Sequence, residues 1–454
     1  MSGDRLLSVE EARAAVLGAI DSPTPPVRVA LTDARGQVAA EAVTSPIDLP
    51  PWDNSAMDGY AILAVDVTAA TEEDPSRLEV IDEVRAGQAP GRSVRSGTAI
   101  RIATGAPVPP GADAVVPVEL TTPLSPAGVP SGPRGRDATG PLPDAIWVHA
   151  AVPVGGSIRR AGSDLVGGVR VVDPGTTVTP AVIGLAAGCG VERITVHRRP
   201  VVGILATGDE VRAPGQALGP AGIPDANGPG LAAMVAEAGG DPRMLGIAGD
   251  TFEDVHDRLA GALADGADVI IVSGGVSVGP YDVVRSAFER FGRIDLWRVA
   301  VQPGKPFAFG TAGRAVESVP APDRPPTLLF GLPGNPVSTF VTFELFVRPA
   351  LRRLAGHRVD DLYRPVDRGV LTGPVSKSHG RRGFVRVTVE RDPMGSPVRD
   401  ERGRVPATLA GGAGGQGSHV LSALATADAL AVIPEADDSL PSGADVDLWW
   451  LDRA

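Results

Sequence analysis

One lysine stands out as a residue that could do chemistry. Of 42 basic residues, two are lysine and the others are arginine, and one of the two, Lys305, lies in QPGKPFAFG between Pro303 and Pro306. A compact ammonium with three donors contacts an anion in a way that a planar guanidinium cannot imitate. The position therefore indicates an anion site; the alternative is a neutral lysine on a surface turn.

A second candidate loop, LLFGLPGNPVSTF, leads from an apolar run into a helical pattern. Pro333 and Pro336 flank Gly334 and Asn335 and fix the backbone ahead of a helix N-terminus, which attracts negative charge. Ser338 offers a hydroxyl in the first turn of that helix and, if the two loops converge, would form an oxyanion pocket with Lys305. Asn335 could equally be a helix N-cap.

A third loop, in DVIIVSGGVSVGPYD, is rich in small residues that let backbone N–H groups approach an anion closely. Its candidate binding residues are Ser273, Gly274, Gly275 and Ser277. Asp282 follows, where its carboxylate could meet a cation carried by the bound anion or could simply cap the next helix.

Acidic residues follow two further apolar runs. Asp209 and Glu210 are adjacent on the turn after VVGILA, and Asp250 follows the run that ends in GIAG. Such acids suit a divalent cation or water in a phosphate site. Helix capping is the alternative for all three.

Polar residues outside these loops are weaker candidates. In the last hundred residues, Arg386 in GFVRV and Ser418 in QGSHV would add a bidentate cation and a hydroxyl to an anion site, or would be ordinary surface residues. Asp58 lies in a dense polar run, DNSAMDGY, and Thr104 lies in the constrained turn TGAP. An Asx-turn at a strand entry is the structural alternative for that run.

Four parts of the chain must position these residues, since 454 residues exceed one ordinary core. Ser8 and Glu11 predict a capped helix from Val9 to about Ile20. Short β-rich runs indicate a mostly β domain at 49–155, with a Pro/Gly/Ser-rich surface loop at Thr121 to Ala145. Alternating strand and helix patterns predict a doubly wound, mostly parallel sheet at 197–355. Residues 1–48 and 156–196 form a discontinuous connector, and 356–454 predict a small β-barrel or sandwich.

Composition excludes several classes of function. A net charge of -12 and a pI near 5.1 argue against general binding of nucleic acid or of an anionic membrane. One cysteine rules out an internal disulfide framework, and no cluster has zinc-ligand spacing. The acidic, amphipathic N-terminus is unlike a targeting segment, and no 18-residue apolar run occurs, so we expect a soluble cytoplasmic protein.

Six motifs in order resemble the molybdopterin molybdenumtransferases, the bacterial MoeA and gephyrin E-domain family: PPWDNSAMDGYA, RIATGAPVPPGADAVV, TGDEV, SGGVSVGPYD, QPGKPFAFG and GLPGNPVS. The resemblance spans nearly the whole chain. It implies a linker domain, an inserted β-rich domain, an α/β domain that holds the pterin, and a C-terminal β-barrel. It also implies that adenylylated molybdopterin and molybdate are converted to molybdenum cofactor with release of AMP, in a step that depends on Mg²⁺.

The resemblance also implies roles for residues. Lys305, Ser338, Arg386 and Ser418 would hold molybdate. Four acids would position Mg²⁺ and the phosphoanhydride of the substrate, and these acids are Asp209, Glu210, Asp250 and Asp282. The implied catalytic positions are Asp58, Thr104, Asp164, Lys305 and Asp282. Further substrate contacts would come from Ser273, Gly274, Gly275, Ser277, Arg298, Pro303, Gly304, Pro333, Gly334 and Asn335. In a homodimer, Asp58 and Thr104 would serve the partner chain's site.

The sequence departs from the usual bacterial pattern at three positions. Gln302 and Arg298 stand where lysine is often found, and Ser163 stands where an acid is usual. The loss of one cation puts in doubt how strongly the site attracts anions.

Two other functions compete with this prediction. Molybdopterin adenylyltransferases share the α/β domain, although their glycine-rich loop usually reads GGTG and they lack the β-rich domains. A gephyrin-like scaffold is the alternative that is not an enzyme. Expected partners are a second copy of the chain, the adenylyltransferase, and apo-molybdoenzymes or their chaperones.

Overall fold

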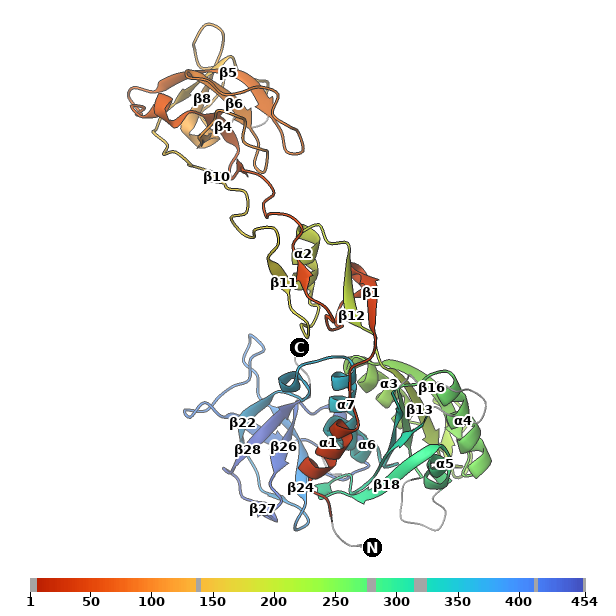
Figure 1. Cartoon of the computed structure of the whole chain (residues 1–454). Coiled ribbons are helices and arrows are strands. Elements are labelled where there is room, and N and C mark those ends of the chain that lie inside the picture. Colours follow the sequence, from red (N-terminus) through yellow and green to blue (C-terminus); the bar gives the residue numbers. More distant parts are fainter. Residues whose placement is uncertain (1–5, 136–139, 276–282, 314–324, 412–414, 452–454) are drawn as a thin grey trace.

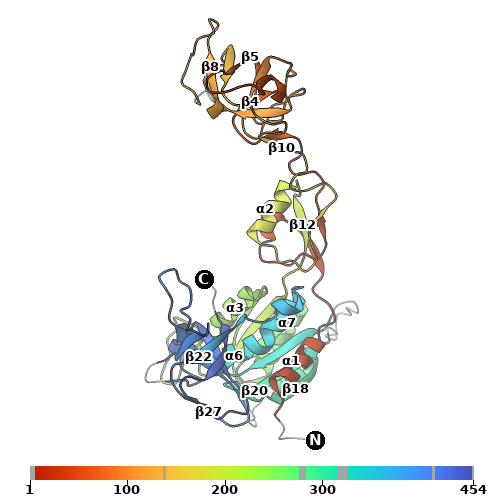
Figure 2. The ribbon, with the colours of Figure 1, turned by 90° about the vertical axis from the view of Figure 1, so that its left-hand side faces the viewer.

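The computed structural model describes residues 6–135, 140–275, 283–313, 325–411 and 415–451. The chain is elongated and has three blocks in a row (Figure 1). A β-rich domain lies at one end, a small linker domain in the middle, and a body made of the α/β domain and a β-barrel at the other end, and a view turned by 90° shows the same order (Figure 2). Among the described residues, no helix has the length and apolar character needed to cross a membrane.

The β-rich domain is built on a six-stranded sheet of order β7-β4-β6-β5-β9-β8. Its strands are β4 (Gly59–Ile62), β5 (Ser76–Val84), β6 (Thr98–Ile102), β7 (Ala114–Pro117), β8 (Thr121–Leu124) and β9 (Ala145–Val148). The segment 121–145, expected to be a surface loop, begins in strand β8 and ends at the first residue of strand β9. These two strands pair antiparallel. Arg134 ties the described part of the loop to the domain through two bonds to Glu72, of 2.6 and 2.9 Å.

The linker domain and its junction with the β-rich domain form where the chain passes outward and returns (Figure 1). On the way out lie β1 (Pro26–Ala30), η1 (Leu31–Asp33), β2 (Val43–Thr44) and β3 (Asn54–Ser55). On the return lie β10 (Ile158–Arg159), β11 (Arg170–Val172), α2 (Pro180–Gly188) and β12 (Arg193–His197). β1 pairs with β12, β2 with β11 and β3 with β10, all antiparallel, so each outward segment is held by its returning partner. β3 and β10 belong to the junction, where the Ser55 N–H donates to the Ala106 carbonyl of the β-rich domain.

Helix α1 (Val9–Gly18) has the predicted capping box. The Ser8 hydroxyl accepts from the Glu11 N–H at 3.0 Å, and the Glu11 carboxylate accepts from the Ser8 N–H at 2.8 Å. The helix packs on the body and not on the linker domain, to which the sequence assigned it. Its buried face, which includes Val9 and Val16, belongs to the same core cluster as Phe343 of the α/β domain.

The α/β domain contains the predicted mostly parallel sheet, with strand order β16-β13-β17-β21-β20-β18. The parallel strands are β16 (Asp241–Ala248), β13 (Val201–Thr207), β17 (Val269–Ser273) and β21 (Thr327–Leu332); β20 (Pro306–Ala312) and β18 (Gly292–Arg298) complete the sheet in antiparallel pairs. Its helices are α3 (Asn227–Glu237), α4 (Phe252–Ala264), α5 (Val283–Phe291), α6 (Pro336–Thr342), the π-helix η4 (Phe343–Val347) and α7 (Arg348–Leu354). Parallel strands place the loops after β13, β17 and β21 at one edge.

The C-terminal domain is a closed five-stranded barrel, which resolves the choice between barrel and sandwich. Its strands run β24 (Arg382–Val389), β25 (Val405–Leu409), β22 (Val366–Leu371), β28 (Asp445–Trp450) and β26 (Ala429–Ile433), and β26 pairs back onto β24. β19 (Val301–Gln302) from the α/β domain adds to β24. The loop that carries Lys305 is thereby attached to the barrel.

A buried ionic network also joins the two domains of the body. The Glu344 carboxylate on η4, 1 % exposed, accepts two bonds from the guanidinium of Arg364, at 2.9 and 3.0 Å. Arg364 lies just before β22 and also contacts Glu237 on α3 at 2.6 Å. Arg348 faces the same Glu344 carboxylate at 3.8 Å. The network fixes the barrel against the helices that lead to the site.

Replacing Glu344 with alanine should destabilise the body by about 3–5 kcal/mol, because the two buried guanidinium groups lose the carboxylate that they share. Urea unfolding followed by the fluorescence of Trp449 and Trp450 measures the loss. The matched control is Glu289→Ala, which breaks an exposed pair with Arg285 and should cost less than about 1 kcal/mol. Equal losses in the two variants would contradict this role of the network.

Candidate active site

A cavity of about 810 Å³ opens at the carboxyl edge of the parallel strands. It is lined by the loops after β13, β17 and β21, by the start of α3, and by Leu421 of α8 (Leu421–Ala425) in the barrel domain. The structure thus brings together many of the predicted residues: Glu210, Asp250, Ser273, Gly274, Gly275, Pro333, Gly334 and Asn335. Ser277 and Asp282 lie outside the described residues.

Asn227 connects two of these loops, although the sequence did not single it out. Its amide Nδ2 donates to the Ser273 hydroxyl at 2.8 Å and to the Gly334 carbonyl at 2.7 Å. The Gly274 N–H donates to the Leu332 carbonyl at 3.1 Å. Gly274 has φ +101° and a Cβ there would lie 2.7 Å from the Thr207 carbonyl oxygen, so the close approach of these loops requires glycine.

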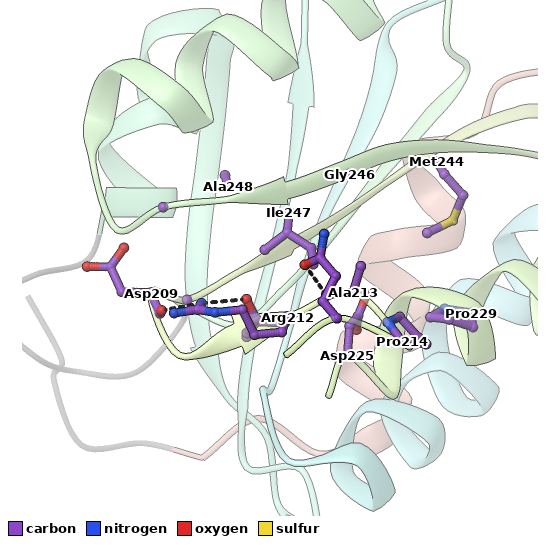
Figure 3. Close-up of a pocket in the computed structure, with 14 residues that line it drawn as sticks. Asp209, Arg212, Ala213, Pro214, Asp225, Pro229, Met244, Gly246, Ile247 and Ala248 are labelled. Carbon is purple, nitrogen blue, oxygen red and sulfur yellow. Dashed lines mark hydrogen bonds between the residues drawn. The ribbon is translucent and has the colours of Figure 1, made fainter. Parts of the chain in front are cut away.

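The acidic residues divide between two cavities. Asp209 and Asp250 hold each other's backbone, since each N–H donates to the other's carboxylate, at 3.3 and 3.1 Å. Glu210 and Asp250 line the large cavity, whereas Asp209 lines a neighbouring one of about 560 Å³ (Figure 3). Within the described ranges no three acidic, histidine or cysteine side chains form a metal-binding group. One or two carboxylates nevertheless suit Mg²⁺, which keeps several waters and takes oxygens from substrate phosphates.

The predicted convergence of the Lys305 loop with helix α6 is supported by Gly304. This residue has φ +110°, and a Cβ on it would lie 2.6 Å from Thr342 Cγ2 and 3.5 Å from the Ser338 carbonyl oxygen. The backbone next to Lys305 therefore lies directly on the helix that carries Ser338. Gln302, in the same loop, accepts a bond from the Ser378 N–H at 2.9 Å, so it contacts the barrel backbone at this junction.

The barrel domain also contacts helix α6. The Val337 N–H, in the first turn of α6, donates to the Ser418 carbonyl at 3.1 Å. Arg386 on β24 donates from Nη2 to the carbonyls of Gly415 and Gly417, at 3.3 and 3.2 Å. Contacts thus run without a break from Arg386 through Ser418 to α6 and the Lys305 loop.

Arg386 is fully buried, with 0 % of its surface exposed. Its Nε and Nη1 have no hydrogen-bond partner in the part of the chain that the structure describes, and no acidic side chain pairs with it there. Burial lowers the pKa of its guanidinium. A buried cation without a counter-charge is costly unless an anion compensates it, so Arg386 indicates an anion-binding site.

The remaining predicted residues lie elsewhere in the single chain. The Asp58 carboxylate accepts from the N–H and hydroxyl of Thr104, at 2.7 and 2.9 Å, in the β-rich domain. Asp164 is exposed in the return segment, where its N–H donates to the Leu49 carbonyl at 3.0 Å. Figure 1 shows the β-rich domain at the opposite end of the molecule from the α/β domain, whose loops line the cavity. Arg298 ends β18, opposite Pro306, and Pro303 precedes Gly304.

Comparisons with known proteins cover the whole molecule. Family models match as the MoeA N-terminal region (domain I and II) at residues 7–190, a probable molybdopterin binding domain at 203–353, and the MoeA C-terminal region (domain IV) at 368–451. The molybdopterin molybdenumtransferase 2 of Mycobacterium tuberculosis is 38% identical over 94% of this chain and 95% of its own. The molybdopterin molybdenumtransferase of Nostoc sp. is 35% identical over 94% of this chain and 89% of its own.

Solved structures agree with these sequence relatives. Two crystal structures of the molybdopterin biosynthesis MoeA protein of Pyrococcus horikoshii have TM-scores of 0.75 and 0.72 to this chain, at 28% and 26% identity. They cover 99% and 98% of this chain and 100% of their own.

The contact at Gly304 can be tested by Gly304→Ala. The added methyl meets Thr342 Cγ2, and the left-handed backbone costs about 1–3 kcal/mol, so the Lys305 loop should shift and molybdate should bind at least about tenfold more weakly in calorimetry. Thr342→Ser, which removes that Cγ2, should restore part of the affinity in the double variant. Gly261→Ala, where a Cβ meets nothing within 4 Å, is the control. Wild-type affinity in Gly304→Ala would contradict the placement of the loop.

Proposed function

The chain belongs to the MoeA family of molybdopterin molybdenumtransferases, and from this we propose that it joins molybdate to adenylylated molybdopterin and releases AMP in a step that depends on Mg²⁺. The coarser activity follows from the family itself: the protein is a transferase of molybdenum cofactor biosynthesis that inserts molybdenum and acts on molybdopterin. The adenylylated form of the substrate and the metal requirement are the proposal.

Arg386 carries the proposal for molybdate. Its Nε and Nη1 are buried, positively charged hydrogen-bond donors without a partner among the described residues. A dinegative tetrahedral oxyanion supplies both the acceptors and the counter-charge. We place molybdate between Arg386, the Lys305 ammonium and the hydroxyls of Ser338 and Ser418. In that position the cations neutralise an anion that would otherwise repel the phosphates of the other substrate.

The pterin substrate is assigned to the large cavity. The glycine-rich loops that line the cavity bring backbone groups close to a ligand. Asn227 bonds to both the Ser273 loop and the Gly334 loop and so fixes their relative position. Glu210 and Asp250 would hold Mg²⁺ at the phosphate end, together with Asp282. When bound, the ion would neutralise charge on the phosphoanhydride and assist its cleavage.

We propose that the working form is a homodimer. Asp58 and Thr104 are bonded to each other, are exposed, and lie at the far end of an elongated chain from its own cavity. A second chain would place them beside the partner's cavity, and Asp164 would line the same approach. The adenylyltransferase that supplies the substrate and the apo-molybdoenzymes or chaperones that take the product remain predicted partners. The cytoplasmic location also stays a prediction.

The alternatives have less support. Adenylyl transfer would not require the barrel, whose buried Arg386 is joined by contacts to the α/β loops. A scaffold without catalysis would not require a buried, uncompensated cation.

Arg386→Met tests the molybdate site. Purified protein is given adenylylated molybdopterin, Mg²⁺ and molybdate, and AMP release and reconstitution of an apo-molybdoenzyme are followed. We expect reconstitution at limiting molybdate to fall by about 100-fold, because a charge-assisted contact worth about 1.5–3 kcal/mol and its desolvated site are lost. The fold should be as stable or more so, since a lone buried charge is removed.

The control for this variant is Arg399→Met, in the same domain, which breaks a pair with Asp367 near the surface. It should leave reconstitution unchanged. If Arg386→Met inserts molybdenum at the wild-type rate at limiting molybdate, the molybdate site is wrongly placed.

The chain offers a matched pair of lysine variants. Lys305→Arg keeps the charge but replaces a compact ammonium with a wider planar group, so turnover should fall by about tenfold or more. Lys377→Arg changes the chain's other lysine, which contacts the carbonyls of Ser378 and Glu435, and should have no effect on turnover. Equal turnover in both variants would show that Lys305 does not need to be a lysine.

A further inference from the structure

Residues 7–18 form a segment that contacts three separate parts of the body, and we call it the N-terminal strap. It comprises Leu7, the capping residue Ser8 and helix α1. Figure 1 shows α1 against the body, apart from the linker domain to which the chain then leads. The apolar face of α1 lies in a core cluster that includes residues of both the α/β domain and the barrel domain. The polar groups of the strap add directional contacts that this packing does not require.

The first contact lies next to the Lys305 loop. The Leu7 N–H donates to the Arg298 carbonyl at 2.9 Å, and the Leu7 carbonyl accepts from the Ala300 N–H at 2.8 Å. Val299, which lies between these two residues, donates its N–H to the Lys305 carbonyl at 2.9 Å. A single stretch of backbone therefore separates the strap from the residue whose ammonium we place at molybdate.

The second contact is an ion pair at the start of β24, the strand that carries Arg386. Glu10 on α1 pairs with Arg382 at 2.5 Å, and the same guanidinium pairs with Glu435, just after β26, at 2.8 Å. The Arg382 N–H donates to the Ala300 carbonyl at 2.8 Å, so the strand also meets the stretch of backbone that the strap binds. Arg382 and Arg386 lie four residues apart on β24 and therefore face the same side of the strand.

The third contact is made by Arg13 on α1 and reaches the π-helix η4. Arg13 Nε donates to the Leu345 carbonyl at 3.1 Å. Pro349, four residues after Leu345, has no N–H, so the donor that an α-helix would use for this carbonyl is missing and the guanidinium supplies one. The guanidinium carbon of Arg13 also lies 4.7 Å from the ring centre of Tyr363 and 5.1 Å from that of Trp449, and such aromatic faces attract a cation.

Each contact ends on a part of the body that carries a donor of the proposed molybdate site. The first reaches the stretch bonded to Lys305, the second reaches the strand of Arg386, and the third reaches η4, which continues the helix that carries Ser338. Apolar packing has no preferred direction, whereas hydrogen bonds and ion pairs fix the geometry of the parts that they join. A shift of about 1 Å in such a site can lower the rate by about 100-fold.

We propose that the N-terminal strap sets the distance between the Lys305 ammonium and the Arg386 guanidinium, with Glu10 and Arg13 as positioning residues for molybdate. Neither residue touches the substrate, and each acts through the element that it holds. The inference rests on the proposed function, because it requires that these two cations bind molybdate. It gives helix α1 a role in the affinity for one substrate, in addition to its packing in the core.

The test follows molybdenum insertion by the intact protein as molybdate is varied, together with urea unfolding of each variant. Arg13→Met removes the charge and the donor to the Leu345 carbonyl. The KM for molybdate should rise about tenfold or more, while kcat at saturating molybdate stays within about twofold of wild type. Arg13→Lys keeps a cation and a donor and should recover most of the affinity. Glu10→Gln breaks a more exposed ion pair and should raise this KM about twofold to fivefold, and it carries the test if Arg13→Met does not fold.

Arg293→Met is the matched control, since Arg293 on β18 is 83% exposed and pairs with Asp295 at 3.4 Å. It should leave the KM for molybdate unchanged. A wild-type KM for molybdate in both Arg13→Met and Glu10→Gln would overturn the positioning role.

An equal rise in the KM for molybdate and for the pterin substrate would also overturn it, because general loosening of the body acts on both substrates alike. The same holds for a loss that Arg13→Lys does not recover. In each of these cases, a raised KM for molybdate in Arg386→Met would leave the proposed molybdate site standing. An unchanged KM in Arg386→Met would overturn the site and the strap's role together.

Discussion

A guanidinium buried without a counter-ion among the described residues is the interaction on which the proposed molybdate site depends. Arg386 has no exposed surface, and two of its nitrogens have no partner among the described residues. Keeping a charge in such a place costs stability, and the cost is offset only when an anion arrives. We therefore propose that the affinity of this site for a small oxyanion comes from a desolvation that folding has already imposed.

The arrangement of the body follows from keeping Arg386 in place beside the α/β loops. Val385 and Val387 on β24 belong to the core inside the barrel, so Arg386 between them lies on the outer face, against the carbonyls of Gly415 and Gly417. The bond between Val337 and Ser418 joins that loop to helix α6. Gly304 lets the Lys305 loop lie against the same helix, while the Glu344 network also fixes the barrel to the α/β domain. The barrel and the α/β domain, which share a core that includes Phe384 and Phe330, would thus contribute cations to the one site that we propose for molybdate.

The sequence predicted the positions of the site loops better than it predicted which residues are buried and what they pack against. Motifs after apolar runs identified the Ser273, Gly334 and Lys305 loops, because strand ends and glycine or proline turns are local signals. The burial of Arg386 depends on what packs against the outer face of the barrel, including the Gly415 and Gly417 carbonyls, and no local pattern encodes that packing. Asn227 lay in IPDANG, where an amide at a helix start looks like ordinary capping. Helix α1 was recognised correctly, but its packing partner depends on tertiary contacts.

In the function that we propose, the acids and the cations of the site act on different parts of the substrates, and Arg386 marks where molybdate should lie. The most direct measurement is a crystal structure of the protein soaked with tungstate, with the metal located by its anomalous scattering. The account predicts a tungsten peak whose oxygens lie within hydrogen-bond distance of Arg386 Nε or Nη1 and of Lys305 Nζ. A fully occupied tungstate elsewhere in the body, with Arg386 still lacking an anion, would contradict it.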